Sequence, residues 1–141
     1  MLMLLCLLVG TLGGWVLTLF AYRQGNEHPS NILGAGLIIA ALIYVFFALL
    51  YANTTWLVIE FAGVGVCSLL FWLAKRYSIY FLAIGWLLHP VWDVGLHLIV
   101  QDGQFAPLWY VYLCISFDVV VALGMVKALC KDTDKHSYQN D

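Results

Sequence analysis

Charged residues are scarce in this chain, and their scarcity excludes most soluble folds. Only 10% of the 141 residues are Asp, Glu, Lys or Arg, whereas 64% are hydrophobic. Soluble domains carry about 25% charged residues, and a domain of this size buries only about two thirds of its surface on folding. Because so much apolar side chain cannot be hidden from water, the composition predicts an integral membrane protein in contact with the lipid bilayer.

Motifs of several soluble enzyme and binding classes are also missing. The sequence contains no glycine-rich nucleotide loop, no CxxC pair and no HExxH zinc motif. The net charge is -2 and no block of like charge occurs, which argues against nucleic acid as a partner. The widely spaced cysteines Cys6, Cys67, Cys114 and Cys130 lie mostly in apolar runs, so buried free thiols are favoured over a disulfide framework.

Five apolar runs approach the ~20 residues that a helix needs to cross ~30 Å of hydrocarbon. They cover residues 1–22, 31–51, 55–74, 78–100 and 107–129, with polar or turn-forming residues between them. The first run lacks the basic start and the small-residue cleavage site of a signal peptide, so we expect it to be retained. The prediction is an all-α integral membrane protein. One domain (residues 1–130) forms a bundle of five transmembrane helices, and residues 131–141 form a polar tail.

The basic residues predict how this bundle is oriented. All of them would lie on one side of the membrane: Arg23, Lys75, Arg76, Lys127, Lys131 and Lys135. Cytoplasmic segments of membrane proteins carry such an excess of Lys and Arg. We therefore expect the N-terminus outside and the tail in the cytoplasm.

Small residues recur at a spacing that lets helices approach closely in lipid. Gly10 and Gly14 lie four apart in the first run, and Gly36 and Ala40 lie four apart in the second. These faces could join helices within one chain or join two chains in a homo-oligomer.

Five ionisable residues fall inside the predicted spans: Glu60, His89, Asp93, His97 and Asp118. A charged Asp at the centre of a membrane helix costs at least ~2.5 kcal/mol, so such groups face a bundle interior or a watery cavity. A rise of 1.5 Å per residue places all five in the outer half of the membrane or near its midplane, at depths of about 7–19 Å. Three helices would thus form one polar pocket. In the last span, one helix face that contributes to it carries Tyr110, Cys114 and Asp118, which are four residues apart.

Pro90 lies in the middle of this polar stretch. A proline inside a helix removes one backbone hydrogen bond and clashes with the carbonyl four residues earlier, here that of Trp86. We expect the helix to bend near Gly85 to Pro90 and to leave this carbonyl free, rather than to end there.

A metal site is one interpretation of the pocket. His89 and Asp93, or Asp93 and His97, have the i, i+4 spacing that supplies two ligands from one helix, and Glu60 or Asp118 could complete a three-ligand set. Because His89 and His97 lie about 12 Å apart along the axis, we favour His97, Asp93 and Glu60. Such a mixture of ligands suits Zn, Fe or Mn.

Other interpretations stay open at this stage. The same residues could bind a proton or a small polar ligand, because chains of Asp, Glu and His act as proton relays. They could serve a membrane-embedded hydrolase or isomerase acting on a lipid-like substrate, with His as general acid or base. They could also form a structural polar core without a ligand, held by interhelical hydrogen bonds.

Two motifs resemble a known family. The pattern His-x-x-Trp-Asp-x-x-x-His at residues 89–97 and the segment "APLWYVYLCISFD" at residues 106–118 are similar to the uncharacterised family DUF6010 of small bacterial integral membrane proteins. The resemblance implies a bacterial inner-membrane protein and no known activity. Carried over by position, it marks His89, Trp92, Asp93, His97, Trp109, Tyr110, Cys114 and Asp118. Of these, we count Trp92 and Cys114 with the five ionisable residues of the pocket. Pro90 departs from the family pattern, so the bend it causes is not expected of the family.

Overall fold

The described chain consists of helices joined by short connections. The computed structural model describes residues 1–24, 29–100 and 104–137, without the side chains of residues 97–99 and 132–137. The helices are α1 (Leu2–Arg23), α2 (Pro29–Tyr51), α3 (Thr54–Arg76), α4 (Tyr80–Asp93), the π-helix η1 (Val94–Ile99) and α5 (Leu108–Ser137). No strand occurs in these ranges, so the all-α prediction is confirmed.

Four of these helices, α1, α2, α3 and the Leu108–Lys131 part of α5, are long and apolar enough to cross a membrane. The remaining apolar helix, α4 with the start of η1, is shorter, because it covers only Tyr80–Leu96. At the C-terminal end, α5 continues past the expected limit at residue 129 and ends at Ser137.

As predicted, the helix that contains Pro90 continues past the proline, and it ends at Asp93. It then widens into η1, where the Val100 N–H donates to the Gly95 carbonyl at 3.3 Å, five residues back. Short π-helical segments are rare and often accompany functional sites. This segment was not expected from the sequence, and the bend near Gly85 stays a prediction.

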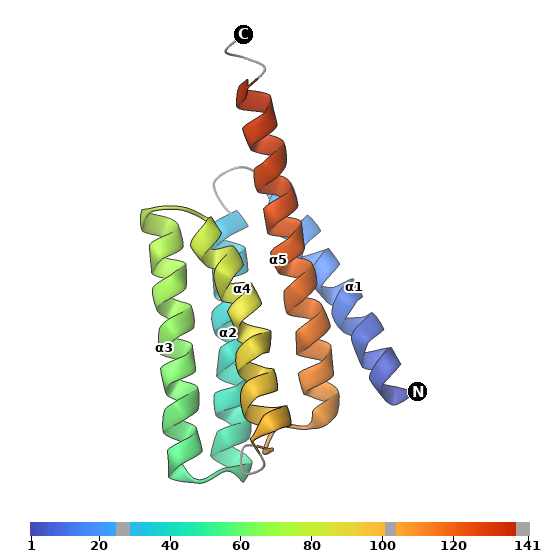
Figure 1. Ribbon diagram of the computed structural model, residues 1–141, viewed down its shortest axis with the longest axis vertical. Helices are drawn as coiled ribbons and strands as arrows, with labels where there is room; N and C mark the ends of the chain where they lie inside the picture. The colour runs from blue at the N-terminus through green and yellow to red at the C-terminus, as the bar shows by residue number, and fades with distance from the viewer. Residues whose placement is uncertain (25–28, 101–103, 138–141) are drawn as a thin grey trace.

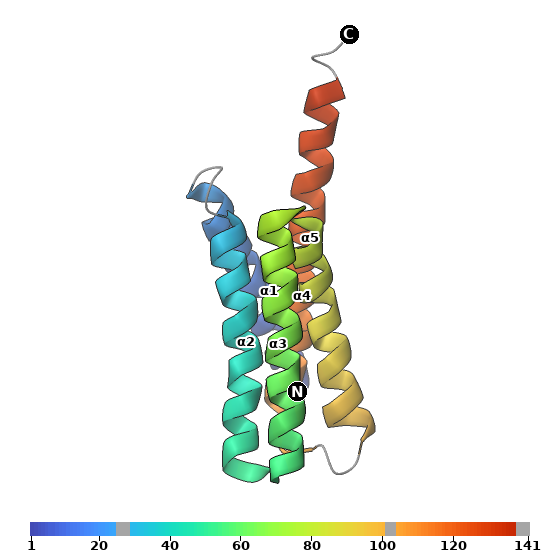
Figure 2. The ribbon, with the colours of Figure 1, turned by 90° about the vertical axis from the view of Figure 1, so that its left-hand side faces the viewer.

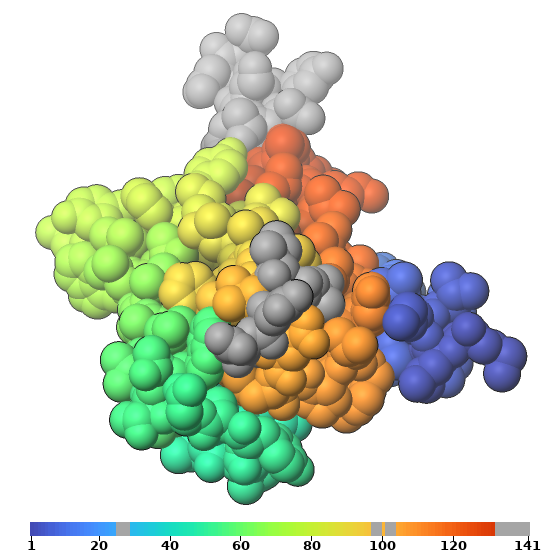
Figure 3. All heavy atoms as spheres, turned by 60° about the horizontal axis from the view of Figure 1, so that its bottom comes forward, coloured from blue at the N-terminus to red at the C-terminus, as the bar shows by residue number. Residues whose placement is uncertain are grey.

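The helices run up and down in chain order, so the connections alternate between two ends (Figures 1 and 2). The C-terminal ends of α1, α3 and α5 lie at the same end of the bundle. At the periphery, α1 packs chiefly on α5, while α2 packs chiefly on α3 and α4 lies between α3 and α5. The view from the lower end shows α1 (blue) standing out to one side of the other helices (Figure 3).

The distribution of side chains is the reverse of that in a soluble protein. Large apolar side chains such as Leu8, Trp15, Ile39 and Phe46 are exposed along the helices. The buried set, in contrast, includes several ionisable residues: Glu60, His89, Asp93 and Asp118. A lipid environment explains this pattern, because hydrocarbon solvates apolar side chains and excludes charged ones.

Glycines let α1 and α5 pack backbone against backbone. A Cβ at Gly14 would lie 2.6 Å from the Phe117 carbonyl oxygen, and a Cβ at Gly10 would collide with the Leu113 carbonyl. The spacing of small residues in the first span therefore serves a contact within the chain. The second pair does not make such a contact, because a Cβ at Gly36 would meet only side-chain atoms, at 3.3 Å or more.

Candidate functional site

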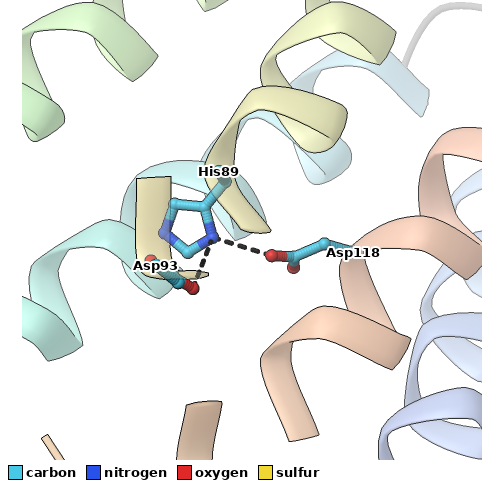
Figure 4. A group of neighbouring side chains, drawn as sticks. All are labelled: His89, Asp93 and Asp118. Atoms are coloured by element: carbon cyan, nitrogen blue, oxygen red, sulfur yellow. Dashed lines mark hydrogen bonds and ion pairs between the residues drawn. The ribbon is translucent and has the colours of Figure 1, made fainter. Parts of the chain in front are cut away.

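Three ionisable side chains from two helices meet in the interior of the bundle. The Nδ1 atom of His89 lies 2.8 Å from Oδ2 of Asp118 and 3.6 Å from Oδ2 of Asp93 (Figure 4). One ligand atom from each residue lies within 4.8 Å of the other two. His89 is 4% exposed, and both aspartates are 0% exposed. We call these three residues the triad.

Local helix geometry explains how α4 contributes two members of the triad. His89 and Asp93 are four residues apart, so they lie on one face of the helix, one turn from each other. Pro90 falls between them without ending the helix. Directly after Asp93 the chain enters η1, so the triad lies where the backbone changes from α- to π-helical geometry.

Asp118 approaches the triad from α5. Its Oδ2 pairs with His89, whereas Oδ1 has no hydrogen-bond partner among the described residues. All three side chains of the triad project from the helices α4 and α5 rather than from a loop. Helical backbone holds such side chains in fixed positions.

Aromatic rings form one wall of the triad. The Tyr44 ring of α2 meets the His89 ring edge-on, with centroids 5.7 Å apart, and meets Tyr110 of α5 at 5.4 Å. Tyr44 is buried, and it interacts with Asp93 as well. Sequence reasoning missed this residue. The available signal was a single hydroxyl within the otherwise apolar stretch of residues 35–50.

A second feature lies on the other side of His89. A cavity of about 40 Å³ between α3 and α4 is lined by Glu60, Cys67, His89 and Trp92, together with small and apolar residues. In Figure 4 the second ring nitrogen of His89 lies on the side of the ring that faces away from Asp118. One water needs about 10–15 Å³ on this measure, so the cavity has room for about three waters.

The predicted pocket residues thus fall into two groups. His89, Asp93 and Asp118 form the triad, and Glu60 and Trp92 line the small cavity beside it. The buried Cys114 of α5 packs near Tyr44 and Tyr110.

The metal set favoured from the sequence was His97, Asp93 and Glu60. In the structure, ligand atoms of Asp93, His89 and Asp118 lie within 4.8 Å of one another. This is one of the other combinations that the spacing allowed. The His97 side chain lies outside the described residues, so the part of the prediction that concerns it is untested.

Charge is not balanced by this set of side chains alone. With both aspartates ionised, the triad carries two negative charges, and His89 supplies at most one positive charge. His89 pairs with both aspartates, at 3.6 Å from Asp93 and 2.8 Å from Asp118. Burying uncompensated charge costs several kcal/mol per ion, so the triad favours taking up one more unit of positive charge, as a proton or as a metal cation.

Comparisons with protein-family models, with curated proteins and with solved structures find no match for this chain. The resemblance to DUF6010 stays an expectation.

Proposed function

We propose that this chain is a five-span membrane protein that binds a divalent metal ion through His89, Asp93 and Asp118. The observation that carries this proposal is the convergence of three buried ligand atoms, from α4 and α5, within 4.8 Å of one another. Zn²⁺, Mn²⁺ and Fe²⁺ all accept mixtures of imidazole and carboxylate ligands.

The proposed topology has the N-terminus outside and the C-terminus in the cytoplasm of a bacterial inner membrane. The basic residues at the ends of α1 and α3 lie at the same end of the bundle as the C-terminal part of α5 (Figure 1). Helix α4 with η1 extends over most of the bundle height, which supports counting it as a span despite its short apolar part. Reporter fusions after Asp102 and after Lys135 should report opposite sides of the membrane.

The distances fit a common metal ligand set. Bonds of about 2.0–2.2 Å to nitrogen and oxygen place neighbouring ligand atoms roughly 3–3.5 Å apart. The two separations from His89 Nδ1, 2.8 Å and 3.6 Å, lie on either side of that interval. The two carboxylates lie within 4.8 Å of each other, so small side-chain movements would bring all three atoms to metal-ligand distances. Three protein ligands would leave a further position for water or another ligand.

Charge balance supports a divalent ion. A neutral imidazole, two carboxylates and one divalent cation sum to zero, so the buried site would carry no net charge. Binding through Nδ1 would leave the second ring nitrogen of His89 as an N–H donor. Metal-bound histidines usually donate that proton to a carboxylate, carbonyl or water, and the cavity shared with Glu60 offers such an acceptor.

The experiment is metal titration of the purified protein in detergent, with ZnCl₂ and MnCl₂ as the probes. We expect one ion per chain in the wild type, measured by elemental analysis and by calorimetry. His89→Gln, Asp93→Asn and Asp118→Asn should each abolish stoichiometric binding, because each removes a ligand while keeping the side-chain size.

Glu60→Gln is the matched variant outside the triad. It should keep one ion per chain, with affinity lowered by roughly tenfold at most if Glu60 supports His89 through water. If Glu60→Gln loses the ion as completely as Asp93→Asn does, then the ligand set is not the triad. If the wild type takes up no stoichiometric ion, then the triad is balanced by a proton and the metal proposal is wrong.

A further inference from the structure

A second and larger cavity lies between α1, α2 and α5. Its volume is about 310 Å³. It exists because α1 packs on α5 and α2 packs on α3, which leaves α2 and α5 separated where Gly36 and Ala40 supply little side chain. Small-ligand sites begin at about 300 Å³, and an apolar cavity of about 150 Å³ is enough to bind benzene. The space therefore suits a molecule roughly twice the size of benzene.

The walls of this cavity are apolar and reach the outer surface of the bundle. Leu17, Ile39, Ile43, Leu113 and Phe117 line it. Ile39 is 58% exposed, so the cavity opens sideways, toward the surface that we assign to lipid. A ligand would enter from the bilayer rather than from water.

One end of the cavity is polar. Tyr110, Cys114 and Asp118 contribute to its lining, and they lie four residues apart on one face of α5. The Asp118 carboxylate is buried, and its Oδ1 atom has no hydrogen-bond partner among the described residues. A buried acceptor without a donor costs about 1–3 kcal/mol, so a ligand that brings a donor to this point gains affinity there.

Charge determines which head group fits. Ionised fatty acids and phosphate groups would be repelled by the adjacent carboxylates of Asp118 and Asp93. The Oδ2 atom of Asp118 already pairs with His89, so the remaining oxygen needs a hydrogen-bond donor. Because a proton or a metal ion supplies the additional positive charge of the triad, this donor can be neutral. A neutral hydroxyl satisfies this requirement.

We infer that the cavity between α1, α2 and α5 binds a lipophilic alcohol, whose hydroxyl donates to Asp118 Oδ1 and whose hydrocarbon body lies among Leu17, Ile39, Ile43, Leu113 and Phe117. This inference goes beyond the metal site and does not require it. A metal bound through Asp118 Oδ2 would leave Oδ1 available.

The test is photolabelling in phosphatidylcholine nanodiscs with a decanol that carries a diazirine. Decane and decanoic acid with the same diazirine are the matched probes. We expect the decanol to label α1, α2 and α5 residues of the cavity saturably, as located by mass spectrometry, and the other two probes to show no saturable labelling. Asp118→Leu should weaken the apparent affinity by about tenfold or more, because the acceptor is lost.

Two further variants keep the test decisive if Asp118→Leu fails to fold. Ala40→Phe fills the cavity without altering the triad and should abolish saturable labelling. Ala62→Phe makes the same change at an exposed position of α3 and should leave labelling unchanged. Equal labelling by decane and decanol would mean that the cavity holds bilayer chains only, and unchanged labelling of Ala40→Phe would place the alcohol elsewhere. Either result overturns the inference.

Zinc binding by the same Ala40→Phe protein separates the two proposals. Retained metal with lost alcohol labelling supports both proposals. Saturable labelling of a wild type that binds no metal, lost in Ala40→Phe, supports the alcohol site and overturns the metal site.

Discussion

Helix α5 packs against two neighbours through chemically opposite surfaces. Toward α1 it presents backbone and small groups, with the Leu113 and Phe117 carbonyls against Gly10 and Gly14. Toward α4 it presents Asp118, which pairs with His89 at 2.8 Å. The α4–α5 contact thus depends on an ion pair between the two helices, and the neighbouring His89–Asp93 pair lies within α4.

The difference shows two ways of holding helices together in lipid. Apolar burial does not favour helix association in a bilayer, because lipid chains are as apolar as leucine. The α1–α5 contact must therefore depend on close fit, and the α4–α5 contact on matched polar groups. Close fit is lost when a side chain grows. A matched polar contact is lost when one partner is removed.

The largest effect is expected at the polar contact. His89→Leu removes the imidazole that pairs with the buried Asp118 carboxylate at 2.8 Å, and breaking a buried ion pair by removing one partner costs about 3–5 kcal/mol. The free energy of unfolding, measured by steric trapping in bicelles, should fall by that amount.

The control replaces the whole triad with leucine: His89→Leu, Asp93→Leu and Asp118→Leu together. Exchanging a complete buried ionic set for apolar residues is often neutral or stabilising, so this variant should regain most of the stability and bind no metal. A triple variant as unstable as His89→Leu would show that size rather than charge dominates at this contact.

A smaller loss is expected at the glycine contact. Gly14→Val places a side chain where even a Cβ would lie 2.6 Å from the Phe117 carbonyl oxygen. Overpacking costs typically about 1–3 kcal/mol, and α1 should separate from α5, as measured by the distance between spin labels on the two helices.

Gly65→Val on α3 is the matched variant, because a Cβ there meets nothing within 4 Å among the described residues. It should change stability by no more than about 0.5 kcal/mol. Equal losses for Gly14→Val and Gly65→Val would contradict the close-fit account of the α1–α5 contact.

The smallest effect is expected for a hydroxyl at the edge of the glycine contact. Thr18 Oγ1 donates to the Gly14 carbonyl at 2.8 Å within α1, and Thr18 also faces Gly124 of α5. Thr18→Val keeps the shape and removes the hydrogen bond. Because this bond lies within α1, stability should fall by no more than roughly 0.6 kcal/mol, the mean for hydrogen bonds that join two membrane helices. A loss above that of Gly14→Val, in the same unfolding assay, would mean that α1 is held by polar contacts after all.

The two contacts also differ in how well the sequence predicts them. Asp118 and His89 stand out because ionisable residues are rare in apolar runs, and their meeting in the interior follows from the cost of exposing them to lipid. The Gly10 and Gly14 spacing is a weaker signal, since the equally spaced Gly36 and Ala40 line a cavity instead of a close contact. Small residues permit close approach without requiring it.

The helical class, the apolar outer surface and the burial of Glu60, His89, Asp93 and Asp118 could be predicted from the sequence alone. These follow from composition and from local spacing, because each span must satisfy its own backbone hydrogen bonds in lipid. The tertiary structure was needed to show that the side chain which lies within 4.8 Å of both His89 and Asp93 is Asp118 rather than Glu60. It also decided that Tyr44 covers them and that α2 and α5 separate to leave a cavity. These features depend on how the helices are rotated and tilted against one another, and the spacing of residues along one helix does not set the position of its neighbour.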